Sequence, residues 1–322
     1  MRLRRSAAVV LAAALLLTGV PACSPEPIVV IPSVTRSVGV APLVVGTPAA
    51  PDGTNPTEGA LLAHVYAAAL NAAGVNAVVS PADPADGTLL DKLEAGTVDI
   101  APGYSRVLLA AAAAKGSTAV PDAATTAQVL DALKKELPQS LAVLDAAKAE
   151  DSDSIAVTTV TAEKYQLKTI ADLAKVCDKL AFGGSAEFRL AERGLSALGS
   201  DYNCVPKSYV QLPNTKNELL LALIRDDVQV ADIHSSSPAI PDNALVVLTD
   251  PKHLFLPQNV VPVVLAAKVP ADVQGVLNKV SGALSTDELV NLNRLAAGSN
   301  KTSLDAVARS WLVQKGLVKA TN

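Results

Sequence analysis

The first part of the chain alternates short apolar runs with amphipathic segments. Residues 43–46 predict a strand, and apolar residues three and four apart between Leu61 and Leu70 predict a helix. Asn55 as N-cap and Pro56 in the first turn would begin that helix. Further strands are expected at 75–80 and 98–101, with a helix at 89–94 between them. This alternation predicts a parallel sheet covered by helices.

The same patterning continues to the end of the chain. It predicts helices at 126–136, 187–198, 218–224, 270–284, 286–297 and 303–315, with another starting at 170–174. It predicts strands at 141–144, 155–158, 180–184, 208–212, 228–232, 245–248 and 260–265. The polar stretch at 150–154 suggests a crossing between two lobes, and the strands at 245–248 and 260–265 flank the return crossing.

These elements divide the chain into two lobes. We expect lobe I to comprise residues 38–150 and 251–322, and lobe II to comprise residues 151–250. About 285 residues are available for folding, more than one compact core usually holds. Two βαβ lobes with two crossings and C-terminal helices fit a solute-binding protein with a ligand cleft between the lobes, although many α/β enzymes show a similar pattern.

The N-terminal segment has the pattern of an export signal. Arginines at positions 2, 4 and 5 precede an apolar run at 7–17, and small residues follow up to Cys23. The run is too short for a permanent membrane helix. A cysteine directly after small residues is typical of a bacterial lipoprotein signal, so we expect residues 1–22 to be removed and Cys23 to carry lipid. An ordinary secretory signal with an incidental cysteine is the alternative.

The region after Cys23 is expected to be a tether. Residues 23–37 are rich in Pro, Val and Ile and would hold the folded part away from the membrane. The remaining sequence shows no second apolar run of spanning length. We therefore expect a protein that is lipid-anchored on the extracytoplasmic face of the cell membrane.

Composition narrows the classes of partner. The formal net charge is −4 and no basic cluster occurs, so nucleic acid is not an expected partner. Besides Cys23, only Cys177 and Cys204 are present, and an oxidising compartment favours a disulfide between them. Closing a loop of this length would stabilise the fold by about 3 kcal/mol. Two isolated cysteines and three scattered histidines lack the spacing of a metal site, so no metal or cofactor is expected.

Several segments together resemble one family, the glycine betaine/choline/carnitine-binding lipoproteins of osmoprotectant ABC importers. Residues 96–104 (Gly-Thr-Val-Asp-Ile-Ala-Pro-Gly-Tyr) resemble the family's G-x-I-D-L-x-P-E-Y segment. Residues 45–46 with 57–58, residues 169–174, residues 182–188 and residues 245–264 carry further parts of the likeness. The resemblance covers residues 44–317 and implies a two-lobed type II periplasmic-binding-protein-like α/β fold. It also implies an ABC permease as partner.

The resemblance implies a cage of aromatic rings for a quaternary ammonium group, which is held by cation–π attraction. Tyr104 matches one cage position. His234, followed by Ser235 and Ser236, stands where the family has another aromatic residue, and Leu220 stands at a further tyrosine position. The family's glutamine after Thr57-Glu58 is Gly59, and its usual arginine position holds Ala191. These departures put the identity of the ligand in doubt more than the transport role.

The candidate ligand-binding residues are Tyr104, Thr57, His234, Ser235, Ser236 and Arg189. Each has a structural alternative: Tyr104 as a surface tyrosine, His234 as a hydrogen-bonded structural histidine, and the serines as caps of a following helix. Arg189 and Arg193 lie four apart on an expected helix, where one would face the cleft or both would be solvated. Trp311 and Tyr66 lie on apolar helical faces and are expected in the core.

An enzyme is the competing class, but the sequence gives little support for one. It contains no Gly-x-Ser-x-Gly elbow, no paired histidines with metal spacing and no phosphate-binding loop. We therefore expect no catalytic activity. A third possibility is the same fold binding a bulkier aromatic or hydroxyl-rich solute, or a surface partner. Import of a small osmoprotectant such as glycine betaine, choline, carnitine or proline is the favoured hypothesis.

Overall fold

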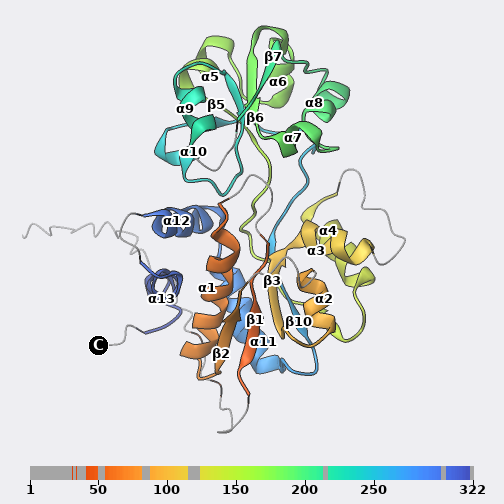
Figure 1. Ribbon diagram of the computed structural model, residues 1–322, viewed down its shortest axis with the longest axis vertical. Helices are drawn as coiled ribbons and strands as arrows, with labels where there is room; N and C mark the ends of the chain where they lie inside the picture. Colours follow the sequence, from red (N-terminus) through yellow and green to blue (C-terminus); the bar gives the residue numbers. More distant parts are fainter. Residues whose placement is uncertain are drawn as a thin grey trace, which may run out of the picture.

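The computed structural model describes residues 31, 34, 41–49, 55–81, 88–114, 124–212, 217–298 and 302–319. The expected signal segment and Cys23 lie outside these residues. Two five-stranded sheets form the centres of two lobes, one above the other in Figure 1. Among the described helices, none combines the length and apolar character needed to cross a bilayer.

The sheet of lobe I has the strand order β2-β1-β3-β10-β4. Its strands are β1 (Leu43–Gly46), β2 (Ala77–Ser80), β3 (Ile100–Tyr104), β4 (Leu141–Val143) and β10 (Val260–Leu265). Its helices are α1 (Glu58–Ala72), α2 (Leu89–Glu94), α3 (Ser105–Ala113), α4 (Thr126–Glu136), α11 (Ala271–Ala283), α12 (Thr286–Ala297) and α13 (Leu304–Gln314). Two buried apolar clusters fill the lobe, one against α1, α11, α12 and α13 and the other against α2, α3 and α4.

The sheet of lobe II has the order β7-β6-β8-β5-β9. Its strands are β5 (Ile155–Val157), β6 (Ala181–Gly184), β7 (Ser208–Gln211), β8 (Val230–Asp232) and β9 (Val246–Val247). Its helices are α5 (Thr159–Tyr165), α6 (Ile170–Ala174), α7 (Ala186–Leu190), α8 (Leu195–Tyr202), α9 (Glu218–Ile224) and α10 (Ala239–Asp242). Helices α3 and α5 were not foreseen from the sequence, and α10 was expected only as an unbounded helix after Ser237.

Both sheets are mixed, whereas the sequence pattern predicted a parallel sheet. In lobe I, β10 runs antiparallel to β3 and β4, and in lobe II, β5 runs antiparallel to β8 and β9. Each reversed strand directly follows a crossing from the other lobe. Periodicity within a strand does not encode the direction from which the chain enters a sheet, so this reversal was invisible in the sequence.

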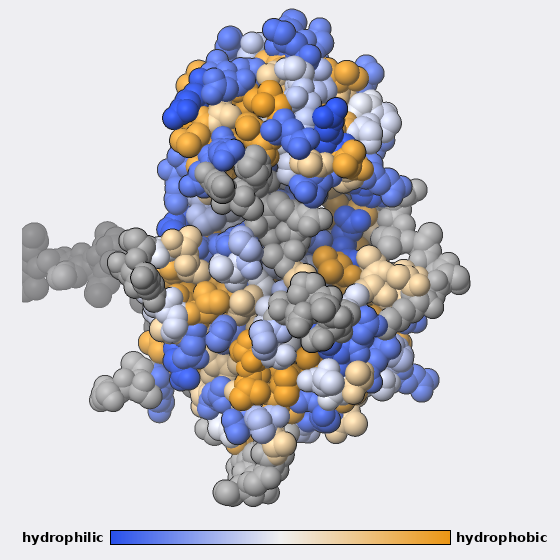
Figure 2. Space-filling model, viewed as in Figure 1, coloured by the Kyte–Doolittle hydropathy of each residue, from blue (hydrophilic) through white to orange (hydrophobic). Residues whose placement is uncertain are grey.

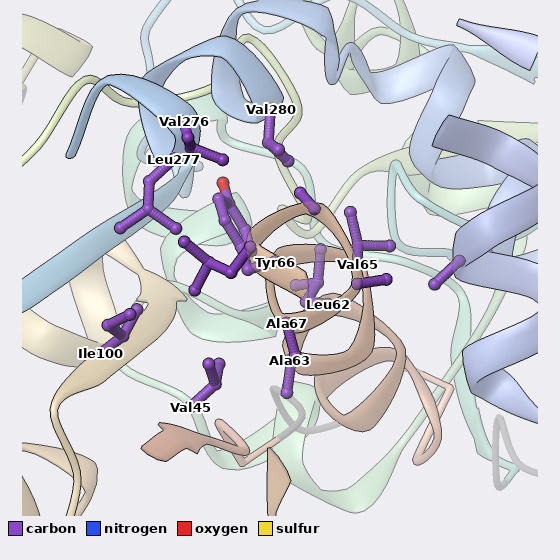
Figure 3. Close-up of a cluster of buried hydrophobic side chains, with 14 of the residues drawn as sticks. Val45, Leu62, Ala63, Val65, Tyr66, Ala67, Ile100, Val276, Leu277 and Val280 are labelled. Carbon is purple, nitrogen blue, oxygen red and sulfur yellow. The ribbon is translucent and has the colours of Figure 1, made fainter. Parts of the chain in front are cut away.

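Helix α1 carries the main core of lobe I. Tyr66 and Trp311 are buried, which confirms that both belong to the core. Figure 3 shows Tyr66 among Leu62 and Val65 of α1 and Val276, Leu277 and Val280 of α11. Its hydroxyl lies 2.9 Å from the Ser281 hydroxyl, so the one polar atom of the ring is satisfied inside an apolar environment.

Helix starts mostly follow their local sequence. The Thr88, Thr125 and Thr169 side chains form capping boxes, and the Ser285 and Ser303 side chains cap α12 and α13. At α1, by contrast, the helix begins at Glu58 rather than directly after Asn55. The Asn55 side chain accepts from the Thr57 amide at 3.1 Å, so it stabilises the turn that precedes the helix.

The expected single helix at 187–198 is two helices. Helix α7 ends at Leu190, α8 begins at Leu195, and a side chain at Gly194 would place its Cβ 1.8 Å from the Phe188 carbonyl oxygen. This close approach of two backbone segments requires glycine. Arg189 and Arg193 therefore do not share a helical face, which corrects the expected four-residue spacing.

Strand β3 is longer than expected and includes Pro102. In its antiparallel pairing with β10, Pro102 lies opposite Pro262. Ser105 donates to the Asn259 carbonyl and Leu265 donates to the Asp99 carbonyl, so the hydrogen-bonded pairs are the alternate ones. Pro102 and Pro262 form a pair without hydrogen bonds, so neither residue needs an N–H group to donate to the other strand. Tyr104 therefore ends a strand and is not in a loop.

Part of the expected tether packs against lobe I. Ile31 and Val34 are buried, and their amides donate to the Leu317 and Ala73 carbonyls at 2.8 and 2.7 Å. These two β-branched residues join the core cluster against α1 because burial of their side chains is favourable. The chain is thus part of the folded lobe at these positions, which corrects the expectation of a free tether up to residue 37.

A disulfide joins Cys177 and Cys204, as predicted. Their Cα atoms are 5.3 Å apart, and the bond connects the short 3-10 turn Cys177–Lys179 to the segment after α8. Both residues are buried in the core of lobe II.

We predict that the double substitution Cys177→Ser, Cys204→Ser lowers the free energy of unfolding by about 3 kcal/mol, because the unfolded chain regains the entropy of an open loop. Urea unfolding with and without reductant measures this. The wild-type protein should lose a similar amount on reduction while the variant is unaffected. Equal stability of reduced and oxidised wild-type protein would contradict the prediction.

Candidate functional site

The candidate site lies where the two crossings pass between the lobes. Glu150 and Asn259 form an antiparallel bridge, and the Gln258 side chain donates to the Asp151 carbonyl at 2.6 Å. The two crossings therefore run side by side. Strand β3 of lobe I and strand β8 of lobe II both point their carboxyl ends toward this region, and such ends are where ligands bind in α/β sheets.

A buried network, here called the interlobe polar cluster, fills the junction. Its members are Glu58, Tyr104, Asp151, His234, Ser236 and Asn293, and all are buried. The Tyr104 hydroxyl donates to one Glu58 carboxylate oxygen, and the Asn293 amide donates to the other. Asn293 also donates to the Ser236 carbonyl at 3.1 Å. The cluster thereby links α1, β3 and α12 of lobe I to lobe II.

Asp151 is the second anchor of the cluster. Its Oδ1 accepts from the Ser236 hydroxyl at 2.7 Å and lies 3.2 Å from His234 Nδ1. On the other side of the ring, His234 Nε2 lies 3.1 Å from an Asp153 oxygen. The imidazole therefore lies between two carboxylates of the first crossing. This contact fixes the end of β8 against the first crossing.

The cluster carries perturbed carboxyl groups. Burial, followed by the charge of Asp151, raises the pKa of Glu58 to about 7. Burial and the charge of Asp153 raise the pKa of Asp232 well above its usual range. Burial alone would lower the pKa of His234, but hydrogen bonds to Asp151 and Asp153 outweigh it and raise that pKa. The junction thus has several carboxyl groups around one imidazole.

A cavity of about 520 Å³ opens beside the cluster, between α12 and the α9–α10 side of lobe II. Lobe I contributes Asn55, Pro56, Asn293, Arg294, Ala297 and Gly298. Lobe II contributes, among others, Asn217, Leu219, Leu220, His234, Ser236 and Ser237. All Phe, Trp and Tyr residues of the chain lie in the described part, and none of them lines this cavity. The described wall is built from amides, hydroxyls and aliphatic side chains, together with the His234 imidazole and the Asp242–Arg294 ion pair.

The expected site residues fall into three groups. His234 and Ser236 belong to both the cluster and the cavity wall. Tyr104 is buried in the cluster, and Ser235 donates to the Glu150 carbonyl at 3.1 Å, so both are engaged within the protein. Thr57 is exposed and donates to Asn55, while Arg189 is exposed with its guanidinium 5.8 Å from the Tyr209 ring centroid.

Of the three serines, Ser237 is the one that accepts a hydrogen bond at the start of the following helix, whose N-cap residue is Pro238. The Ser237 hydroxyl oxygen accepts from the Ala239 amide at 3.3 Å, just before α10. Ser235 and Ser236 instead bind the first crossing, through the Glu150 carbonyl and the Asp151 carboxylate. The capping alternative for those two serines is therefore wrong, because both hydroxyls face the crossing and not the helix.

Sequence reasoning missed three members of the interlobe polar cluster. Glu58 was noted only as part of a Thr-Glu pair, Asp151 only as part of a polar stretch, and Asn293 only as part of a helix. For Glu58 and Asn293 a signal was present in the sequence. Both are polar residues among apolar helical positions, where a buried polar side chain needs a hydrogen-bond partner. Within the described residues, no three His, Cys, Asp or Glu side chains are arranged to hold a metal ion.

The paired sheets, the two crossings and the cavity between the lobes define a two-lobed solute-binding protein. The family described as the substrate-binding domain of the ABC-type glycine betaine transport system matches residues 53–314, and the chain belongs to this family. That family binds solutes for ABC transporters, a role that is not catalytic and that places the binding domain outside the cytoplasm.

Individual relatives are more distant. The carnitine transport binding protein OpuCC of Listeria monocytogenes is 28% identical over 165 residues, which is 50% of this chain and 53% of that protein. The match thus spans about half the length of this curated relative. A solved glycine betaine/carnitine/choline ABC transporter protein aligns with a TM-score of 0.72 at 18% identity, covering 85% of this chain and 99% of the other.

A second solved structure, apo YehZ from Escherichia coli, aligns with a TM-score of 0.67 at 24% identity, covering 86% of this chain and 99% of that chain. At these identities the likeness establishes the fold. The expected two-lobed periplasmic-binding-protein architecture is therefore confirmed.

The raised pKa of Glu58 predicts that stability falls as pH rises from about 4.5 to 7. In that window the unfolded carboxyl has lost its proton while the folded one keeps it, so the folded state binds more protons. The raised pKa of His234 acts in the same direction at higher pH, since its stabilising charge is lost there. Thermal unfolding at pH 5, 6, 7 and 8 measures the slope.

Glu58→Gln should make this profile shallower between pH 5 and 7, because one titrating group is gone while Asp232, whose pKa burial also raises, remains. Glu163→Gln removes the same charge at an exposed position of α5 and serves as the control, with the wild-type profile expected. A Glu58→Gln profile as steep as that of the wild type would show that another group causes the slope.

Proposed function

We propose that this protein captures a small osmoprotectant in the cavity between its lobes and presents it to an ABC permease. The observation that supports this most strongly is the coincidence of two independent features. The cavity lies between the lobes, and its wall includes Leu220 and His234, the positions at which the resemblance places cage residues. The ligands suggested by the family description and the named relatives are glycine betaine, choline and carnitine, with proline as a further candidate.

The proposed mechanism is closure by bending of the two crossings. Lobe I would comprise residues 38–150 and 251–322, and lobe II residues 151–250, so that the chain passes between them at the Glu150–Asn259 bridge. A ligand that touches both Asn55 on lobe I and Leu220 on lobe II favours the closed arrangement because it binds that state more tightly. The permease would then recognise the closed form.

Anchoring is part of the proposal. Cys23, after removal of residues 1–22, would carry the lipid that keeps the protein at the extracytoplasmic face of the membrane. Figure 2 shows hydrophilic residues over much of both lobes, which suits a folded part that stands in water.

Calorimetric titration of the purified protein with glycine betaine, choline, carnitine and proline tests the capture step. Saturable binding of one of these solutes with one-to-one stoichiometry supports the proposal. A folded, disulfide-bonded protein that binds none of the four counts against a quaternary ammonium or proline ligand. A bulkier, hydroxyl-rich solute is the second candidate, favoured by a cavity wall that has no aromatic residue.

Restoring an aromatic ring provides a sharper test. Leu220→Tyr should tighten the binding of choline or glycine betaine about 2- to 30-fold, since each ring that faces a quaternary ammonium contributes roughly 0.5–2 kcal/mol. Leu221→Tyr is the matched control, because Leu221 is the next residue of α9, is exposed and does not line the cavity. Equal affinities in the two variants would argue against a cation at this wall.

The anchor has its own prediction. Cys23→Ala should move the protein from the membrane fraction to the soluble extracytoplasmic fraction, because the acylated residue is lost. Fractionation followed by mass spectrometry of the N-terminal peptide measures this. An N-terminal peptide of the membrane-bound wild-type protein with an unmodified Cys23 would refute lipid attachment at this residue.

A further inference from the structure

One residue of the interlobe cavity wall, Asn293, has a buried hydrogen-bond acceptor that a trimethylammonium group cannot satisfy. Asn293 is 1% exposed and lines the cavity. Its amide nitrogen donates to the Glu58 carboxylate and to the Ser236 carbonyl. Both partners are acceptors, so they fix which end of the amide is nitrogen. The opposite end, Oδ1, is buried and has no hydrogen-bond partner among the described residues.

A buried acceptor of this kind favours a ligand that donates. An unsatisfied buried polar atom costs about 1–3 kcal/mol, and a ligand O–H or N–H group recovers that cost. Glycine betaine and choline carry a trimethylammonium group with no N–H donor, so that group cannot hydrogen-bond to Asn293 Oδ1. Choline has one hydroxyl, whereas a polyol has several that can reach more than one wall residue.

The formal charges on the described residues of the cavity wall are paired. His234 lies between Asp151 and Asp153, at 3.2 and 3.1 Å. Arg294 pairs with Asp242, with their closest nitrogen and oxygen 2.6 Å apart. Among these described residues a charged ligand would find no uncompensated partner, and its desolvation would not be repaid. A neutral ligand avoids that cost.

The remaining wall residues suit a solute with polar edges and C–H faces. Asn55 accepts from Thr57 with its side-chain oxygen, and Asn217 is exposed at the mouth of the cavity. Leu219 and Leu220 supply an aliphatic surface. The volume of about 520 Å³ falls within the range of small-molecule sites and has room for a solute larger than a betaine.

We infer that the interlobe cavity accepts a neutral solute with several hydroxyl groups, the size of a hexitol or a small sugar, and that Asn293 and Asn217 hydrogen-bond to it. This inference rests on the proposed solute-binding function of the same cavity and specifies its ligand class. On this inference the cavity selects its solute by the hydrogen-bond donors that the solute carries and not by a positive charge.

Calorimetric titration of the purified protein with sorbitol, myo-inositol and maltose, alongside choline and glycine betaine, tests the inference. At least one of the three hydroxylated probes should bind more tightly than either quaternary ammonium. Asn217→Gly should then weaken its binding about threefold to tenfold, the loss of one hydrogen bond. Asn293→Ala should weaken it at least as much.

The chain offers a matched control. Asn217 and Asn203 both have a left-handed backbone with φ of 57°, both are exposed, and only Asn217 lines the cavity. Glycine readily adopts the left-handed backbone conformation at either position, so Asn203→Gly should leave binding unchanged. If Asn293→Ala does not fold, as judged by circular dichroism, the comparison of Asn217→Gly with Asn203→Gly decides the matter.

The failures are distinguishable. Binding of choline or glycine betaine without binding of any hydroxylated probe overturns this inference and leaves the proposed capture of an osmoprotectant intact. Binding of a hydroxylated probe that is equally weakened by Asn217→Gly and Asn203→Gly also overturns it, because the site then lies elsewhere. A folded protein that binds none of the five probes overturns this inference and counts against the proposed function as well.

Discussion

The placement of the two lobes depends on one buried carboxylate. Glu58 stands at the first turn of α1, and it accepts from Tyr104 of the same lobe and from Asn293 of α12, which in turn donates to the Ser236 carbonyl of lobe II. A buried polar group is tolerated only where such partners surround it, so the network allows few alternative positions of the lobes. The same network also shapes the cavity, because Asn293 and Ser236 line it.

This arrangement explains how a binding protein can depart from the chemistry of its family and keep the fold. Tyr104, which resembles a cage residue, is engaged by Glu58 inside the junction, while Leu220 and His234, at positions where the resemblance implies aromatic residues, line the cavity. The crossings, the paired sheets and the interlobe position of the cavity do not depend on those rings. Ligand class can therefore change through a few wall residues while closure of the lobes continues to work.

Much of the architecture followed from local pattern. Strand β1 and helices α2, α4, α9 and α12 begin and end where periodicity and capping residues placed them. The errors have physical causes: Gly194 divides a helix because two backbones meet there, and Pro102 continues a strand because it sits at a pair that exchanges no hydrogen bonds. At the candidate site, the predicted residues His234 and Ser236 lie on the cavity wall, but their partners Asp151 and Asn293 were not predicted.

The sequence by itself determined the two βαβ lobes, the buried faces of their helices, the pairing of Cys177 with Cys204 and the scarcity of aromatic rings for a cage. These features are set by residues close together in the chain or by composition. Only the tertiary structure decided the reversed strands β5 and β10, the burial of Tyr104 and the meeting of Glu58, Asp151 and Asn293. Those contacts join residues 93 to 235 positions apart, and no local periodicity encodes which distant groups must satisfy one another's hydrogen bonds.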